Sequence, residues 1–177
     1  MKIDLSQVLS RADYSDEQTG DFEISSLELS GSVISLSADP YTVYLTNEGG
    51  IRLGVRADVT VHVKRSCDRC LEEVLSDHEV SVDEVFDIAD ESVVSDPDED
   101  GQWFSEDVLD ADRMIADELL LMLPPKALCR EDCKGLCPVC GTNLNTGSCQ
   151  CDRQVLDPRM ARILEVFSEN NDKGAKG

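Results

Sequence analysis

Eight cysteines in close pairs constrain this 177-residue chain more than any other feature, and six of them fall within 23 residues. The N-terminal run Met1–Leu5 has no continuous apolar stretch, so we expect no export signal and a cytoplasmic location. Structural disulfides are rare in that reducing compartment, and closely paired thiols there favour metal binding. The cysteines are Cys67, Cys70, Cys129, Cys133, Cys137, Cys140, Cys149 and Cys151.

The segment from Cys137 to Gly141, with the sequence Cys-Pro-Val-Cys-Gly, is typical of a zinc knuckle. Two residues between the thiols allow a tight turn that aims both sulfurs at one ion, and Gly141 permits a positive φ behind the turn. Zinc takes four ligands in a tetrahedron, so this knuckle needs a second pair of thiols. The first candidates are Cys149 and Cys151, and the rival pair is Cys129 and Cys133.

Six thiols in the tail exceed one tetrahedral site, whereas eight in the chain match two sites. Our hypothesis therefore puts the last four cysteines on one ion and the first four on a second ion, which ties the tail to the middle of the chain. We predict one or two Zn²⁺ ions with a structural role, because a catalytic zinc usually keeps a water and histidine or carboxylate ligands. The two predicted ligand sets are Cys137, Cys140, Cys149 and Cys151, and Cys67, Cys70, Cys129 and Cys133.

The first half of the chain has the period-two alternation of β-strands. Apolar and polar residues alternate from Ile51 to Lys64, which predicts one strand with a buried and a wet face. It exceeds the usual length of about 5–6 residues, so we expect a bend or bulge at Gly54. The Val-rich run Glu73–Phe86 predicts the returning strand, with Cys67 and Cys70 at the hairpin tip. Shorter strands are predicted at Phe22–Ser30, Val33–Ala38 and Tyr41–Thr46.

The second half has helical patterns on both sides of the cysteines. Asp107 to Leu123 has a broad apolar face that includes Val108, and two prolines end it. Trp103 and Phe104 are expected to anchor the chain on the core. Asp157 and Pro158 open a short amphipathic helix.

These patterns predict an α+β chain: a curved antiparallel sheet or partial barrel, followed by a helix and a small Cys-rich zinc-binding tail with a C-terminal helix. The predicted division is an antiparallel β domain over 1–86, an acidic flexible loop over 87–101, a helix packing on the sheet over 102–125, a zinc-binding module over 126–169, and a disordered tail over 170–177.

The formal net charge of −21 is concentrated in residues 71–125, where 19 acidic residues face one base, Arg113. Such a surface keeps a protein in solution or docks a basic partner such as a ribosomal protein. It excludes a protein that coats a phosphate backbone over its whole surface. Basic residues near the cysteines still allow a weak RNA contact. They are Lys64, Arg65, Arg69, Arg130, Lys134, Arg153, Arg159 and Arg162.

Two cysteine blocks resemble the YceD family, the large ribosomal RNA subunit accumulation proteins. One block is Ser66–Leu71. The other runs from Leu128 to Gly141 and continues through Asn143-Leu144-Asn145 and Cys149-Gln150-Cys151 to Asp157-Pro158-Arg159. The resemblance implies a non-enzymatic role in accumulating large-subunit ribosomal RNA and in ribosome assembly. The expected mode of action is binding of a basic ribosomal protein or a large-subunit precursor particle.

Two other functions remain open from the sequence. Cys-x-x-Cys with Cys-x-Cys also suits a redox-responsive zinc chaperone, which releases its ion on oxidation. A thiol oxidoreductase using Cys67 and Cys70 is disfavoured, because reactive pairs usually lie at a helix N-terminus. The chain has no Gly-rich phosphate loop and no run of about 20 apolar residues. We therefore expect no catalytic residues, no small-molecule substrate and no membrane span, and we expect His62 and His78 to be structural.

Overall fold

The structure is a computed structural model that describes residues 1–94 and 103–152. The chain divides into two compact units between Cys129 and Arg130. The C-terminal helix and disordered tail predicted from Asp157 onward lie outside the described residues, as do residues 95–101 of the predicted acidic loop.

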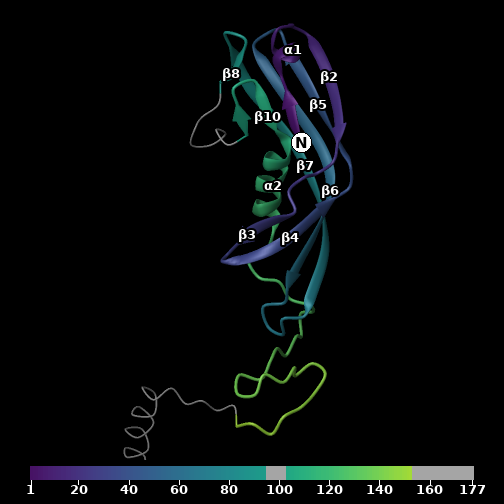
Figure 1. Ribbon diagram of the computed structural model, residues 1–177, viewed down its shortest axis with the longest axis vertical. Coiled ribbons are helices and arrows are strands. Elements are labelled where there is room, and N and C mark those ends of the chain that lie inside the picture. Colours follow the sequence, from purple (N-terminus) through teal and green to yellow (C-terminus); the bar gives the residue numbers. More distant parts are fainter. Residues whose placement is uncertain (95–102, 153–177) are drawn as a thin grey trace, which may run out of the picture. The chain divides into compact units, whose positions relative to one another are not determined.

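The elements of the first unit (Figure 1) are β1 (Lys2–Asp4), α1 (Ser6–Leu9), β2 (Tyr14–Gly20), β3 (Ser26–Leu29), β4 (Ser32–Ala38), β5 (Tyr41–Glu48), β6 (Arg52–Ser66), β7 (Glu73–Ala89), β8 (Ser92–Val94), β9 (Phe104–Ser105), β10 (Val108–Asp110) and α2 (Ala111–Met122).

The long predicted strand is confirmed as β6, the centre of an antiparallel sheet. Along one edge it pairs with β7 from Arg52 to Ser66. Its other edge is shared, since β5 pairs with its first half and β4 with its second half. The sheet is therefore forked and open, with β2 and β3 as the outer strands of the fork. This pairing shows a mostly antiparallel sheet and does not show a closed barrel.

The bulge expected at Gly54 is not there; the irregularity lies in the partner strands instead. Leu36 of β4 pairs with Val63, and Val43 of β5 pairs with Ala57, so the register moves by one residue between them. The intervening Asp39 and Pro40 form this extra step, and the Asp39 N–H donates to the Thr60 carbonyl at 3.3 Å. A proline has no N–H for a ladder, so it is tolerated at such a break.

The bulge explains how β4 and β5 bury the same face of the sheet. The buried positions of β4 are even-numbered, Ile34 and Leu36, whereas those of β5 are odd-numbered, from Tyr41 to Asn47. Because side chains alternate strictly along a strand, one additional residue is needed to switch from even to odd. Gly54 has a different role: a Cβ there would lie 2.5 Å from the Thr46 hydroxyl oxygen.

The hairpin beyond the long strands corrects the prediction of a loop starting at residue 87. Strand β7 continues to Ala89 and pairs with β8, and Val93 lies opposite Ile88. The two turn residues, Asp90 and Glu91, have φ values of 53° and 61°, as the tight turns of two-residue hairpins require. Acidic residues between the apolar ones had hidden this strand pattern from the sequence.

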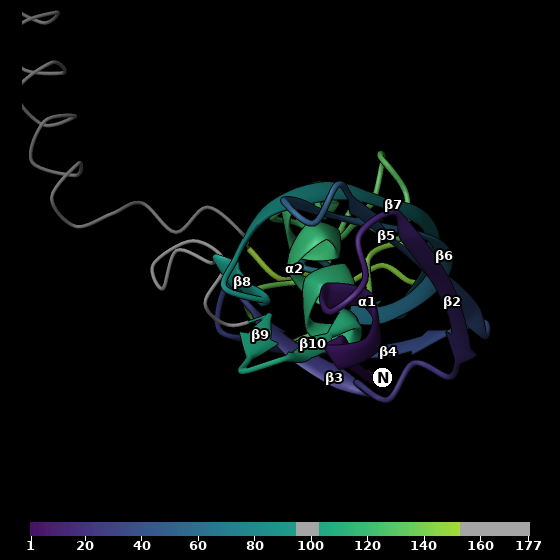
Figure 2. The same ribbon diagram turned by 90° about the horizontal axis from the view of Figure 1, so that it is seen from above.

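Helix α2 occupies the concave side of the curved sheet, as Figure 2 shows from above. The helix begins at Ala111 rather than Asp107, because the side chain of Asp110 caps it by accepting the Arg113 N–H at 3.2 Å. Val108 was expected on the helix but belongs to β10, which pairs with β1. The segments β1, α1, β2, β9 and β10 were not predicted from the sequence.

The apolar core lies between α2, α1 and the concave face of the sheet. The predicted anchor is confirmed: Trp103 and Phe104 both pack edge-on against Phe86, with ring centroids 6.2 and 4.8 Å away. Among the described residues, no helix has the length and apolarity needed to cross a membrane.

One carboxylate is buried within this core. Asp112 of α2 is 2% exposed and accepts the Tyr41 hydroxyl at 2.6 Å and the Glu23 backbone N–H at 3.0 Å. It also pairs with the amino group of Met1. Buried charges are tolerated when donors surround them in this way, so Asp112 fixes α2 to strand β5.

Candidate metal centres

The turn between β6 and β7 carries the first cysteine pair, as predicted. The Leu71 N–H donates to the Cys67 carbonyl at 2.9 Å, and the Cys67 N–H donates to the Glu72 carbonyl at 2.8 Å. Leu71 has a φ of 61°, which is costly for a residue with a Cβ. This turn aims the thiols of Cys67 and Cys70 to the same side.

The predicted knuckle in the second unit has the same backbone hydrogen bonds. The Gly141 N–H donates to the Cys137 carbonyl at 2.8 Å, and the Cys137 N–H donates to the Thr142 carbonyl at 2.8 Å. Gly141 has a φ of 72°, which glycine adopts without steric cost. The two Cys-x-x-Cys turns are therefore structurally equivalent, although only the second has the glycine that made it recognisable in the sequence.

A segment after α2 is held against the first turn by reciprocal hydrogen bonds. The Asp68 N–H donates to the Ala127 carbonyl at 2.9 Å, and the Ala127 N–H donates to the Asp68 carboxylate at 2.6 Å. Arg65 donates to the Pro124 carbonyl at 2.9 Å. These contacts bring Cys129 to the hairpin, where its sulfur lies 3.5 Å from that of Cys70.

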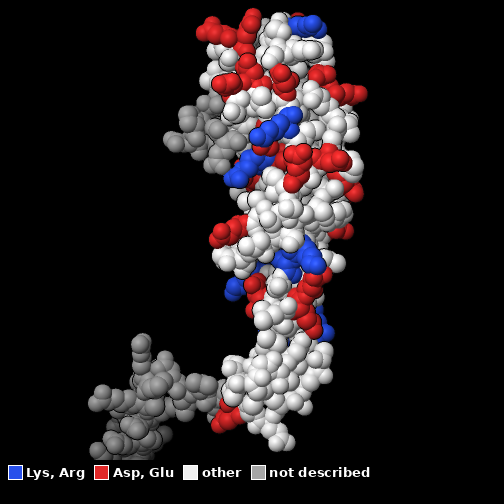
Figure 3. Space-filling model, viewed as in Figure 1, with Lys and Arg blue, Asp and Glu red and all other residues white. Residues whose placement is uncertain are grey.

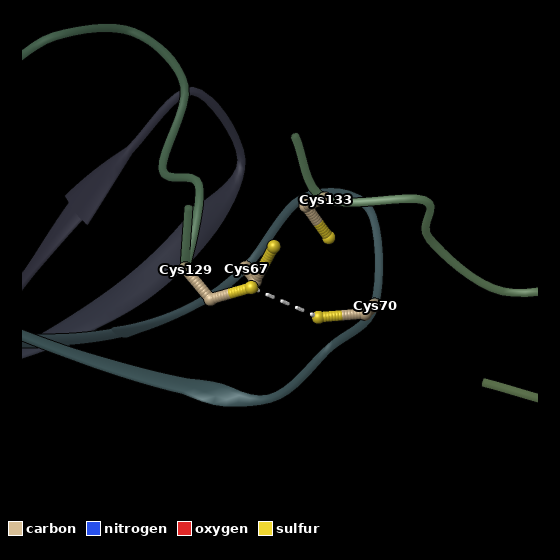
Figure 4. A group of neighbouring side chains, drawn as sticks. All are labelled: Cys67, Cys70, Cys129 and Cys133. Carbon is tan, nitrogen blue, oxygen red and sulfur yellow. Dashed lines mark hydrogen bonds between the residues drawn. The ribbon is translucent and has the colours of Figure 1, made fainter. Parts of the chain in front are cut away.

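Four sulfur atoms form the first cluster (Figure 4), and they all lie within 4.8 Å of one another. Three of these cysteines are buried and Cys129 is partly exposed. The cluster consists of Cys67, Cys70, Cys129 and Cys133.

The second cluster lies wholly in the second unit, and its four sulfurs are also within 4.8 Å of one another. A β-bridge between Leu136 and Asn143 supports its knuckle. This cluster is the more open one, because Cys140 is exposed and two of its other members are partly exposed. Its cysteines are Cys137, Cys140, Cys149 and Cys151.

Both clusters have the chemistry of a closed zinc site. A tetrahedron with Zn–S bonds of about 2.3 Å places its sulfurs roughly 3.8 Å apart, which is compatible with the sulfur separations in both groups. Each group could therefore hold a metal ion. The structure divides the thiols into the same two groups that we expected from the sequence, while ligation itself remains a prediction.

The surroundings of three thiols shift their pKa values in opposite directions. Burial raises the pKa of Cys67, but the backbone N–H groups of Arg69, Cys129 and Cys70 outweigh burial and lower it to about 6. The hydroxyl and backbone N–H of Thr142 lower the pKa of Cys140 to about 6. The pKa of Cys151 rises to about 12, chiefly through its hydrogen bond with Cys140.

Neighbouring side chains support the clusters and were missed in the sequence. The Asn145 amide donates to the Cys133 sulfur at 3.3 Å, and its carbonyl oxygen accepts the Lys134 N–H at 2.8 Å. The hydroxyl oxygen of Thr142 lies 3.1 Å from the Cys140 sulfur.

Neither histidine belongs to a cluster in the described part of the chain. His62 contacts the Asp77 carboxylate at 2.8 Å, and this hydrogen bond raises its pKa. His78 contacts the Ser76 hydroxyl at 2.9 Å.

Two members of the predicted basic patch form ion pairs with acidic neighbours. Lys64 pairs with Glu73 at 2.5 Å, and Arg130 pairs with Asp132 at 3.4 Å. Arg153, Arg159 and Arg162 lie outside the described residues.

The fold and these clusters define an antiparallel β domain combined with two four-cysteine groups. The chain belongs to the YceD family, described as large ribosomal RNA subunit accumulation protein YceD, whose family model matches residues 55–166. This matched region contains all eight cysteines.

Curated relatives share this sequence over part of their length. Uncharacterized proteins of Mycobacterium bovis and Mycobacterium tuberculosis are 34% identical over 128 residues, which is 71% of this chain and 59% of theirs. An uncharacterized protein of Mycobacterium leprae is 32% identical over 91 residues, which is 51% of this chain and 42% of its own. The chain thus spans less than two thirds of the length of these relatives. No solved structure matches it.

Proposed function

We propose that the protein is a non-enzymatic cytoplasmic factor for the accumulation of large-subunit ribosomal RNA, which acts by binding a basic ribosomal protein or a precursor particle. Family membership carries this proposal. The charge distribution supports the type of partner: residues 1–129 contain 30 acidic and 9 basic side chains, whereas residues 130–177 contain 7 of each.

Acidic side chains form scattered groups over the displayed face of the first unit, with fewer basic side chains between them (Figure 3). A surface of this charge repels naked RNA and attracts basic proteins. The nearly neutral second unit, with its cysteine cluster, is the part better suited to a weak contact with RNA.

Sedimentation of cell extracts tests the proposed function. We expect the protein to travel with large-subunit precursors at low salt and to dissociate as the salt concentration rises, because screening weakens charge-driven binding. Cells without the protein should contain less large-subunit than small-subunit ribosomal RNA. Restriction of the protein to the unbound fraction, with an unchanged ratio of the two RNAs, would contradict the proposal.

We propose further that each cluster holds one Zn²⁺ ion as a structural staple. Metal analysis of the purified chain should give two zinc ions. The double variant Cys149→Ser/Cys151→Ser should retain one, and Cys67→Ser/Cys70→Ser should also retain one. If the first variant keeps both ions, our division of the ligands is wrong.

The exposure of Cys140 supports a second candidate function, that of a redox-responsive zinc chaperone. Hydrogen peroxide would oxidise two thiolates to a disulfide and be reduced to two waters with uptake of two protons, and the ion would leave. We expect zinc release from the open second cluster before the buried first one. Equal release rates from the two single-cluster variants would argue against this function.

A further inference from the structure

Strand β7 has one edge that is largely unpaired. Its inner edge pairs with β6 along the whole length of that strand, whereas its outer edge pairs with β8 only at Asp87, Ile88 and Ala89. Among residues 1–94 and 103–152, no strand pairs with the outer edge from Glu73 to Phe86. Such an edge presents a row of backbone donors and acceptors.

Two hydrogen bonds identify the residues that face this edge. The Ile88 N–H donates to the Ile51 carbonyl at 2.8 Å, and at the hairpin turn the Cys67 N–H donates to the Glu72 carbonyl at 2.8 Å. Even-numbered residues of β7 therefore bond toward β6, since the register between them is constant. Hydrogen-bonding direction alternates along an antiparallel strand, so the odd-numbered residues turn their N–H and C=O groups outward. In the unpaired part of the edge they are Glu73, Leu75, Asp77, Glu79, Ser81, Asp83 and Val85.

Acidic charge is the protection that this edge has against strand pairing. Natural edges are shortened, bulged, covered, or occupied by proline or by charged residues, lysine above all. The segment Glu73–Ala89 contains no proline, glycine, lysine or arginine, and it has no bulge against β6. By comparison, the outer strand β3 has four residues and β2 has seven.

Charge on this strand selects the partner. The segment carries six carboxylates and no Lys or Arg, so pairing with a second copy would place like charges side by side. Side chains of β6 offset part of this charge: Lys64 pairs with Glu73, and His62 hydrogen-bonds Asp77. Arg56 and Arg52 lie opposite Asp83 and Asp87, whereas Glu79 lies opposite the neutral Thr60. Cations on an added strand would offset the acidic charge that remains.

We infer that the outer edge of β7 receives an extended basic segment of a protein partner as an additional strand. Backbone hydrogen bonds to the outward residues would supply affinity, and alternating Lys or Arg side chains would supply specificity. The inference rests on the proposed function and names the surface through which that function acts.

The variant Ser81→Pro tests the site. Proline removes an outward N–H at the middle of the edge and leaves the bonds to β6 intact, as in natural edge strands. Ser81→Ala is the matched control, because both variants lose the hydroxyl that donates to Asp58 at 2.7 Å. The probe is a ten-residue peptide of alternating lysine and valine, titrated against the full zinc-loaded chain.

We expect Ser81→Pro to weaken binding of this peptide at least tenfold and Ser81→Ala to change it less than twofold. A peptide of the same charge with methylated backbone nitrogens, and a peptide of alternating glutamate and valine, should each bind at least tenfold more weakly. Equal binding by the methylated peptide, or equal effects of the two variants, would overturn the inference.

Amide exchange of the unmodified chain keeps the inference testable even if Ser81→Pro fails to fold. Amides of the outward residues from Leu75 to Val85 should exchange faster than those of the even-numbered residues between them, and the lysine peptide should slow them at least tenfold. Protection of these amides in the free chain would show that the edge is already covered, which also overturns the inference. Co-sedimentation with precursor particles would survive that outcome, so the two proposals can fail separately.

Discussion

Gly141 shows how a single residue sets the geometry of a cluster. Its φ of +72° favours glycine, and a Cβ there would meet nothing within 4 Å. Any loss of folding free energy in Gly141→Ala therefore comes from the backbone conformation alone, and it amounts to about 1–2 kcal/mol.

We expect Gly141→Ala to weaken zinc binding at the second cluster about tenfold, measured by competition with a chelator. Gly31 is the matched control, because it has a φ of +80° with equally open space but lies in the β3–β4 turn. Gly31→Ala should cost similar stability without affecting zinc. A zinc affinity that stays the same in Gly141→Ala would show that the turn does not preorganise the thiols.

Tyr41 makes stability depend on pH in the alkaline range. Burial, together with its hydrogen bond to Asp112, raises the pKa of the phenol above its ordinary value near 10. Above that pH the unfolded chain releases the proton while the folded chain keeps it. The contribution of Tyr41 is therefore complete below pH about 10 and is lost as the pH rises further.

The free energy of unfolding of the unaltered chain should thus fall more steeply above pH 10 than that of Tyr41→Phe, by up to about 1.4 kcal/mol per pH unit. Denaturant titrations at several pH values measure this difference. Parallel pH profiles for the two proteins would mean that the folded state does not hold the Tyr41 proton.

Among elements, the broken strand β4–β5 depends on the number of residues at its break. Asp39 and Pro40 together lie opposite one residue of β6, so removing one of them leaves a regular strand. Removing both shifts the register again and causes a reversal, in which the side chains of either β4 or β5 turn to the opposite face of the sheet. This reversal would expose either Ile34 and Leu36 or the buried positions of β5. Exposure costs about 1.5–3 kcal/mol of folding free energy for each large side chain.

Deletion of Asp39 combined with Pro40→Thr should therefore preserve the fold, whereas deletion of both residues should abolish cooperative unfolding. Circular dichroism during thermal unfolding distinguishes these outcomes. Similar stability of the two deletion variants would contradict the register assigned to these strands.

The sequence predicted the elements that have a recognisable apolar pattern, which are the long β6, β7 and α2 and the shorter β3, β4 and β5. β6, β7 and α2 each contain enough apolar residues to show a period. Strand β2 reads Tyr-Ser-Asp-Glu-Gln-Thr-Gly and gives no such signal, because its place depends on pairing with β5. The even-to-odd switch at Pro40 was present in the sequence, but its meaning depended on knowing that β4 and β5 share one partner.

At the scale of the whole molecule, the two units differ in how many apolar residues they bury. The main core consists of residues between Ile3 and Leu123, so it lies entirely in the first unit. In the described part of the second unit, the buried apolar residues are the cysteines Cys133 and Cys137. The zinc proposed for the clusters would order this unit, since structural zinc contributes on the order of 10–16 kcal/mol.

Chelation of zinc should consequently disorder residues 133–151 and leave most of the β signal of the first unit intact. Amide exchange and far-ultraviolet circular dichroism, measured before and after chelation, test this. Restored protection after zinc addition serves as the control. Persistent protection of the second unit without metal would show that zinc is not its staple.

The sequence by itself suggested the division of the thiols into two groups of four, because tetrahedral zinc chemistry favours two four-thiol sites for eight closely paired cysteines, and the sulfurs of each group lie within 4.8 Å of one another. It also determined the long strands and the helix, whose periodicity is local. Only the tertiary structure decided which edges remain unpaired, where the register shifts, and which donors surround Asp112. These features depend on contacts between residues far apart in the chain, and no local pattern specifies them.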